Sequence, residues 1–63
     1  MGIKKARLQA NITQQQLAEA IGVNQSSVAL WETGQTLPRA DKLIDIAKLL
    51  NCTIEELLKK EGE

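Results

Sequence analysis

Histidine, tyrosine and phenylalanine are absent from this 63-residue chain, which has one tryptophan, one cysteine and one proline. A single cysteine excludes an internal disulfide, and the lack of histidine removes the commonest zinc ligand. We find no Gly-rich phosphate loop and no set of acid, base and nucleophile, so the sequence argues against an enzyme. We expect no cofactor, no metal site and no small-molecule substrate.

Long hydrophobic runs are also missing. The longest apolar stretch, at residues 28–31, is far shorter than the roughly 20 residues that span a bilayer, and no basic leader precedes a hydrophobic segment. These absences predict a soluble, cytoplasmic protein that does not contact membranes. So short a chain has room for one domain and buries only about 60% of the surface that its unfolded form exposes. We therefore expect a homodimer, in which a second copy adds stability.

The apolar residues that are present are Leu, Ile, Val and Ala, with Trp31 as the lone aromatic side chain, and this composition favours helices over sheets. Hydrophobic spacing predicts an all-α, compact five-helix bundle, with helices near residues 3–10, 14–21, 25–33, 40–50 and 54–58. The expected inward positions are Ile3, Ala6 and Ala10; Leu17, Ala18 and Ile21; Val28 and Trp31; Leu43, Ile46, Ala47 and Leu50; and Ile54, Leu57 and Leu58.

Several helix ends carry recognisable signals. Thr13 and Gln16 fit a capping box at the start of the second helix, and Gly22 suits the left-handed turn that ends it. Asn24 is a good N-cap for the third helix, and Gly34 stops that helix.

The formal net charge is zero and the sequence pI is about 6.2, which counts against nucleic acid as a partner if the chain is treated as uniform. The charge is unevenly distributed, however. Residues 1–39 have four basic and two acidic side chains, a balance of +2, whereas residues 40–63 have four basic and six acidic ones, a balance of −2. Any surface that faces phosphate should therefore lie in the first part.

Residues 14–34 contain two expected helices joined by a tight turn. Helices that cross steeply through such a turn need a small residue at the crossing, a residue that tolerates positive φ, and apolar anchors on both sides. Ala18 and Gly22 meet the first two needs, and the anchors are Leu17, Ile21, Val23, Val28 and Trp31. The spacing predicts a helix-turn-helix core at residues 14–34 in a single domain that takes residues 1–63.

The outward face of the third helix has short side chains and almost no charge. It holds Gln25, Ser26, Ala29, Leu30 and Thr33. Such side chains suit the edges of DNA bases: glutamine can pair with adenine through two hydrogen bonds, and an apolar side chain can touch a thymine methyl group. Plain solvent exposure is the alternative for Gln25 and Ser26, and packing inside the domain is the alternative for Leu30.

The whole pattern resembles the lambda-repressor-like, Xre-type helix-turn-helix family over about residues 3–58. The resemblance is carried by the segments Ile3-Lys-Lys-Ala-Arg7, Ile12-Thr-Gln14-x-x-Leu17-Ala18, Ile21-Gly22-Val23, Val28-x-x-Trp31-Glu32-x-Gly34, Pro38 and Leu43-x-x-Ile46-Ala47. It implies a five-helix domain that binds double-stranded DNA with its third helix in the major groove, and a transcriptional regulator, a repressor rather than an activator.

The resemblance also implies roles for single residues. It assigns base contacts to Gln25, Ser26, Ala29 and Leu30, and backbone contacts to Gln14, Asn24, Gln35, Thr36 and Arg39. Gln14 is further expected to brace Gln25, and Arg7 to form a structural pair with Glu32. Dimer contacts are expected at Leu57 and Leu58.

This chain departs from the family pattern in the loop after Gly34. Gln35 and Thr36 stand where many relatives have Lys or Arg, and fewer cations predict weaker binding of DNA by a single copy. The neutral charge also permits another class of function, a protein-interaction or antitoxin-like adaptor module that keeps the fold.

Overall fold

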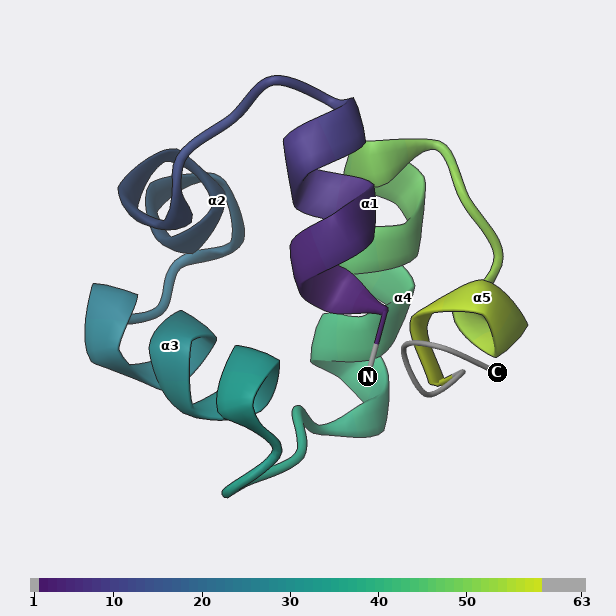
Figure 1. Ribbon diagram of the computed structural model, residues 1–63. Coiled ribbons are helices and arrows are strands. Elements are labelled where there is room, and N and C mark those ends of the chain that lie inside the picture. Colours follow the sequence, from purple (N-terminus) through teal and green to yellow (C-terminus); the bar gives the residue numbers. More distant parts are fainter. Residues whose placement is uncertain (1, 59–63) are drawn as a thin grey trace.

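The computed structural model describes residues 2–58, and these form five α-helices without a β-strand. The helices are α1 (Ile3–Gln9), α2 (Gln14–Ile21), α3 (Gln25–Thr33), α4 (Ala40–Leu50) and α5 (Ile54–Leu58). In Figure 1, α2 and α3 lie together on one side, α1 and α4 occupy the middle, and α5 lies on the other side. The predicted all-α class with five helices is confirmed. None of the helices described has the length and apolar character to cross a membrane.

The ends of α2 follow the sequence signals. The Thr13 hydroxyl accepts a hydrogen bond from the Gln16 backbone N–H at 3.0 Å, and the Gln16 side chain accepts one from the Thr13 N–H at 2.8 Å. This reciprocal pair is the expected capping box. Gly22 then ends the helix at φ +76°, a left-handed conformation that costs glycine little. Gly34 ends α3 in the same way, at φ +83°.

Two expectations at helix ends are corrected. Asn24 occupies the N-cap position of α3, but its side chain makes no capping hydrogen bond. Ala10, expected to point inward, is exposed: α1 ends at Gln9, Ala10 is its C-cap residue, and the left-handed Asn11 follows at φ +60°.

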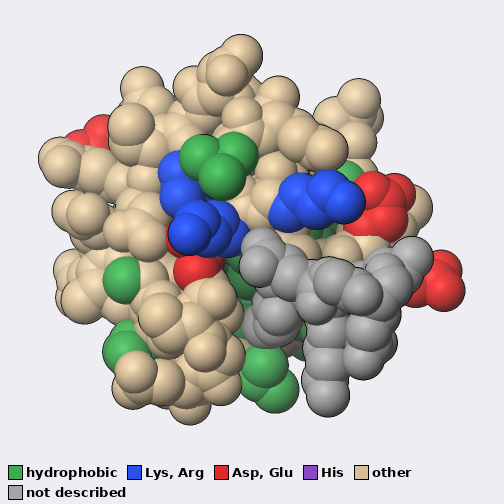
Figure 2. Space-filling model, in the orientation of Figure 1, with side chains coloured by type: hydrophobic (Ala, Val, Ile, Leu, Met, Phe, Trp, Pro, Cys, Tyr) green, Lys and Arg blue, Asp and Glu red, His purple; other side chains and the backbone are tan. Residues whose placement is uncertain are grey.

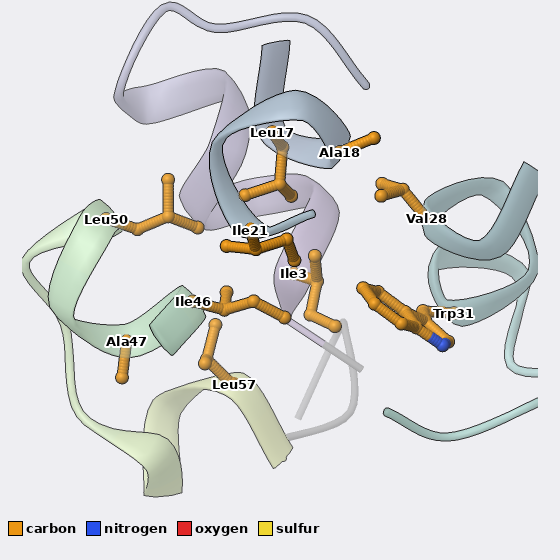
Figure 3. Packing of buried hydrophobic residues seen from close by; sticks show 10 residues of the cluster. All are labelled: Ile3, Leu17, Ala18, Ile21, Val28, Trp31, Ile46, Ala47, Leu50 and Leu57. Carbon is orange, nitrogen blue, oxygen red and sulfur yellow. The ribbon is translucent and has the colours of Figure 1, made fainter. Parts of the chain in front are cut away.

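Every helix contributes to one hydrophobic core. Its buried apolar members are Ile3, Leu17, Ala18, Ile21, Val28, Trp31, Ile46, Ala47, Leu50 and Leu57. Figure 3 shows the aliphatic side chains converging between the helices, with the Trp31 ring covering the end next to α3. Trp31 therefore fixes α3 to the rest of the domain while leaving the other face of that helix free.

Helix α5 is anchored by one side chain. Leu57 is fully buried, whereas Ile54 and Leu58 are 38% and 51% exposed, so the expectation that all three point inward is wrong for two of them. A helix of five residues has few positions that can face the core. The Gly2 backbone N–H donates to the Leu57 carbonyl at 2.8 Å, which joins the start of α1 to α5. Because Leu57 belongs to the core, the structure also corrects its assignment to a dimer surface.

Candidate nucleic-acid interface

The outward face of α3 carries the side chains assigned to base contacts. Gln25 and Ser26 are exposed, Leu30 is 38% exposed and Ala29 is half-buried. Val28 and Trp31 hold the opposite face in the core, which answers the question left open for Leu30: it is not a core residue. The four side chains lie on the face of α3 that is turned away from Val28 and Trp31, and we call this set the strip on α3.

The turn between α2 and α3 depends on close packing. Ala18 is 2% exposed, and its carbonyl accepts a hydrogen bond from the Val23 N–H at 2.9 Å, just after Gly22. The last turn of α2 is also capped from a distant part of the chain, because Lys42 Nζ donates to the Ile21 carbonyl at 2.9 Å. A cation at this position opposes the partial negative charge of a helix C-terminus. Sequence reasoning missed this contact, which joins residues 21 positions apart.

Arg7 of α1 and Glu32 of α3 form a salt bridge. Arg7 Nε donates to Glu32 Oε2 at 2.7 Å, and Arg7 Nη2 donates to Glu32 Oε1 at 3.2 Å. Arg7 Nη1 also donates to the Ile12 carbonyl at 2.8 Å. The two side chains are only 9% and 4% exposed, so the pair ties α1, the loop before α2 and the end of α3 together in a shielded place.

Gln14 connects this ion pair to the strip on α3. Its Nε2 donates to Glu32 Oε1 at 2.9 Å, and its Oε1 accepts from Gln25 Nε2 at 3.5 Å, a long hydrogen bond. The contact between Gln14 and Gln25 matches the expected brace. The bond from Gln14 to Glu32 was not foreseen, since it joins positions 18 residues apart that share no local pattern.

The candidates for contact with the DNA backbone lie at both ends of α3. Gln14 and Asn24 are near its N-terminal end, and Asn24 is exposed with a side chain that does not cap the helix. Gln35, Thr36 and Arg39 are exposed in the loop that follows its C-terminal end. The structure thus places the two groups at opposite ends of the strip on α3 and does not bring them together.

Charge is arranged so that α3 presents no unpaired acid. Its single carboxylate, Glu32, is paired with Arg7, whereas Glu55 and Glu56 lie on α5, on the other side of the molecule. Figure 2 shows basic side chains near the middle of the face that α1 crosses. Lys4 and Lys5 of α1 are both exposed. The two described acids of α5 therefore lie away from α3.

Cys52 has no feature of a reactive thiol. Burial, and after it the Glu56 carboxylate, raises the pKa of the Cys52 thiol above its ordinary value. The thiol therefore stays protonated at neutral pH, which disfavours nucleophilic chemistry. Within residues 2–58, no three Cys, Asp or Glu side chains gather as a metal site would require.

Comparison with known proteins adds an independent finding. A family model described as Helix-turn-helix matches residues 3–57. The HTH-type transcriptional activator BcrR of Enterococcus faecalis is 37% identical over 59 residues, which make up 94% of this chain and 29% of BcrR. Repressor protein C2 of Salmonella phage P22 is 32% identical over 57 residues, 90% of this chain and 26% of C2.

A third relative is the cryptic phage CTXphi transcriptional repressor RstR of Vibrio cholerae, which is 40% identical over 47 residues. The match covers 75% of this chain and 42% of RstR. The chain thus spans less than half the length of each of these three relatives. No solved structure matches it.

Proposed function

The chain belongs to the helix-turn-helix family, in its lambda-repressor-like form, and from this we propose that it binds double-stranded DNA sequence-specifically and regulates transcription. In this proposal α3 enters the major groove. The observation that carries it is the exposed, nearly uncharged face of α3, which two groups of polar side chains flank while Val28 and Trp31 hold the helix from behind. Repression requires only that the protein occupy its DNA site, so we propose that the protein is a repressor. We further propose that it acts in the cytoplasm.

The side chains on α3 supply contacts to base edges. Gln25 pairs with adenine through its amide, Ser26 donates to or accepts from either member of a base pair, and Leu30 with Ala29 contacts thymine methyl groups. The DNA sequence that the protein recognises is therefore rich in A·T pairs. Gln14 and the free backbone amides at the start of α2 hold a phosphate, because a helix N-terminus presents donors and partial positive charge.

We propose that two copies act together as a homodimer on half-sites roughly 34 Å apart, one turn of DNA. The described domain measures 29 × 24 × 21 Å, so copies lying side by side fit that spacing. The exposed Ile54 and Leu58 line a hollow on α5 together with Thr53, Glu55 and Glu56. With Leu57 buried, the apolar contribution to this interface comes from Leu58 and Ile54.

Selection from a random duplex library, followed by a salt titration of the selected duplex, tests DNA binding directly. We expect one enriched A·T-rich motif and an affinity that falls as salt rises, because binding to phosphates releases counterions. An adaptor that binds an apolar protein surface would not lose affinity with salt in this way. Failure to enrich any sequence, or an affinity that salt leaves unchanged, would remove the DNA proposal in favour of the adaptor.

Replacing Gln25 by alanine is expected to remove the preference at one base pair in each half-site. Loss of a bidentate contact reduces discrimination at that pair by about 1–3 kcal/mol, while preferences at other positions remain. Repeating the library selection with the variant measures this change. Gln15→Ala is the matched control, since Gln15 is an exposed glutamine whose side chain, among residues 2–58, bonds only to Glu19 on the same helix. An unchanged motif for Gln25→Ala would exclude Gln25 as a base reader.

A further inference from the structure

We propose that Glu32 is a positioning residue that sets the base preference of Gln25 without touching DNA. It fixes the orientation of the Gln14 side-chain amide, and Gln14 in turn fixes the orientation of the Gln25 side-chain amide. This inference rests on the proposed function, in which Gln25 contacts a base. It assigns a role in recognition to a shielded charge that otherwise serves only to hold α1 against α3.

The first step is the chemistry of the carboxylate. The Glu32 side chain is 4% exposed and paired with Arg7, and an ionised carboxylate can only accept hydrogen bonds. Gln14 lies 2.9 Å from Glu32 Oε1 and must therefore turn its NH₂ group toward the carboxylate. The amide oxygen of Gln14 is left facing the other way, toward α3.

The second step is the effect of the Gln14 orientation on the amide of Gln25. An oxygen on Gln14 accepts from Gln25 Nε2, at 3.5 Å, so the nitrogen of the Gln25 amide lies on the Gln14 side. Every donor along the line from Gln25 to Glu32 therefore points toward the buried charge. Gln25 is exposed, and it keeps one N–H and its oxygen for a base.

The third step is the match to a base pair. Adenine presents an acceptor at N7 next to a donor at N6, which the remaining N–H and oxygen of Gln25 complement, whereas guanine presents two acceptors, N7 and O6. An unrestrained glutamine can turn its NH₂ group toward both guanine acceptors. A glutamine whose nitrogen is held by Gln14 cannot, because its oxygen then faces guanine O6. Glu32 thus favours adenine over guanine at this position.

The test compares two duplexes that differ only in A·T or G·C at the base pair identified with Gln25→Ala. In Glu32→Gln, the new amide can donate as well as accept, so Gln14 is free to lie either way round. We expect the ratio of affinities for the A·T and G·C duplexes to fall about tenfold, a change within the range of one bidentate contact. Circular dichroism at the assay temperature verifies that each variant is folded.

Gln14→Met breaks the same line of hydrogen bonds at a half-buried surface position, so it tests the proposal even if Glu32→Gln does not fold. We expect it to lower the ratio as much as Glu32→Gln does. Arg7→Lys is the control for a merely structural role. It weakens the ion pair and lowers the unfolding temperature, but the carboxylate remains as an acceptor for Gln14, and the ratio should stay at its original value.

The inference is overturned if a folded Glu32→Gln variant keeps the original ratio, if the ratio is unchanged in Gln14→Met, or if Arg7→Lys lowers it equally. These outcomes are distinct from failure of the proposed function. In that case the unmodified chain selects no DNA motif, and both proposals fall together.

Discussion

Replacing Arg7 by methionine is expected to lower the free energy of unfolding by about 3–5 kcal/mol, the usual cost of leaving one member of a buried ion pair without its partner. Glu32 would keep its negative charge in a place where its side chain is 4% exposed, with Gln14 as its remaining side-chain donor. A domain of this size has little stability to spare, so most molecules would be unfolded at 37 °C. Urea titration followed by circular dichroism measures the loss.

A second variant separates the loss of attraction from the burial of an unpaired charge. Replacing both partners, as Arg7→Met with Glu32→Leu, removes the charge that the single variant leaves behind. Apolar replacements of a buried pair are often neutral or stabilising, so we expect the double variant to recover most of the stability. Equal losses in the single and double variants would show that the ion pair itself, and not the stranded carboxylate, accounts for the effect.

The second large effect is expected at α5. Leu57→Ala should lower the free energy of unfolding by about 2–5 kcal/mol, because it removes a fully buried side chain and leaves a cavity in the core that also contains Ile3 and Ile46. Leu58→Ala, one position further along the same helix, should change it by no more than about 0.5 kcal/mol, since Leu58 is 51% exposed.

Urea titration at high dilution, where self-association does not contribute, gives both values. The pair is well matched, because the two substitutions remove the same atoms from neighbouring positions of one helix. Similar losses for the two variants would contradict the burial seen here and would point to a different docking of α5.

The elements that could be predicted from the sequence are those with local chemical signals. The reciprocal bonds of Thr13 and Gln16 and the left-handed glycines Gly22 and Gly34 are read within a few residues of the chain. Each signal acts on the backbone beside it, so the bounds of α2 and α3 follow without knowledge of the tertiary structure. The resemblance to a family supplied the longer-range pair of Arg7 and Glu32.

The remaining features depend on the packed structure. The bond from Gln14 to Glu32 and the cap that Lys42 places on α2 join segments that only the folded chain brings together. The inward face of α5 was misjudged because five residues are too short for hydrophobic spacing to identify one face. Asn24 was expected to cap α3, yet that position leaves its side chain free for another contact.

The hydrogen bond between the Gly2 N–H and the Leu57 carbonyl brings the two ends of the described residues 2–58 close together. Where chain ends lie close together, proteins often tolerate circular permutation, with new ends opened at an exposed loop. A short linker from α5 back to α1 would let the polypeptide be opened at residues 35–37, beyond the C-terminal end of α3. The order of the helices along the gene could then change while the arrangement of α2 against α3 stayed the same.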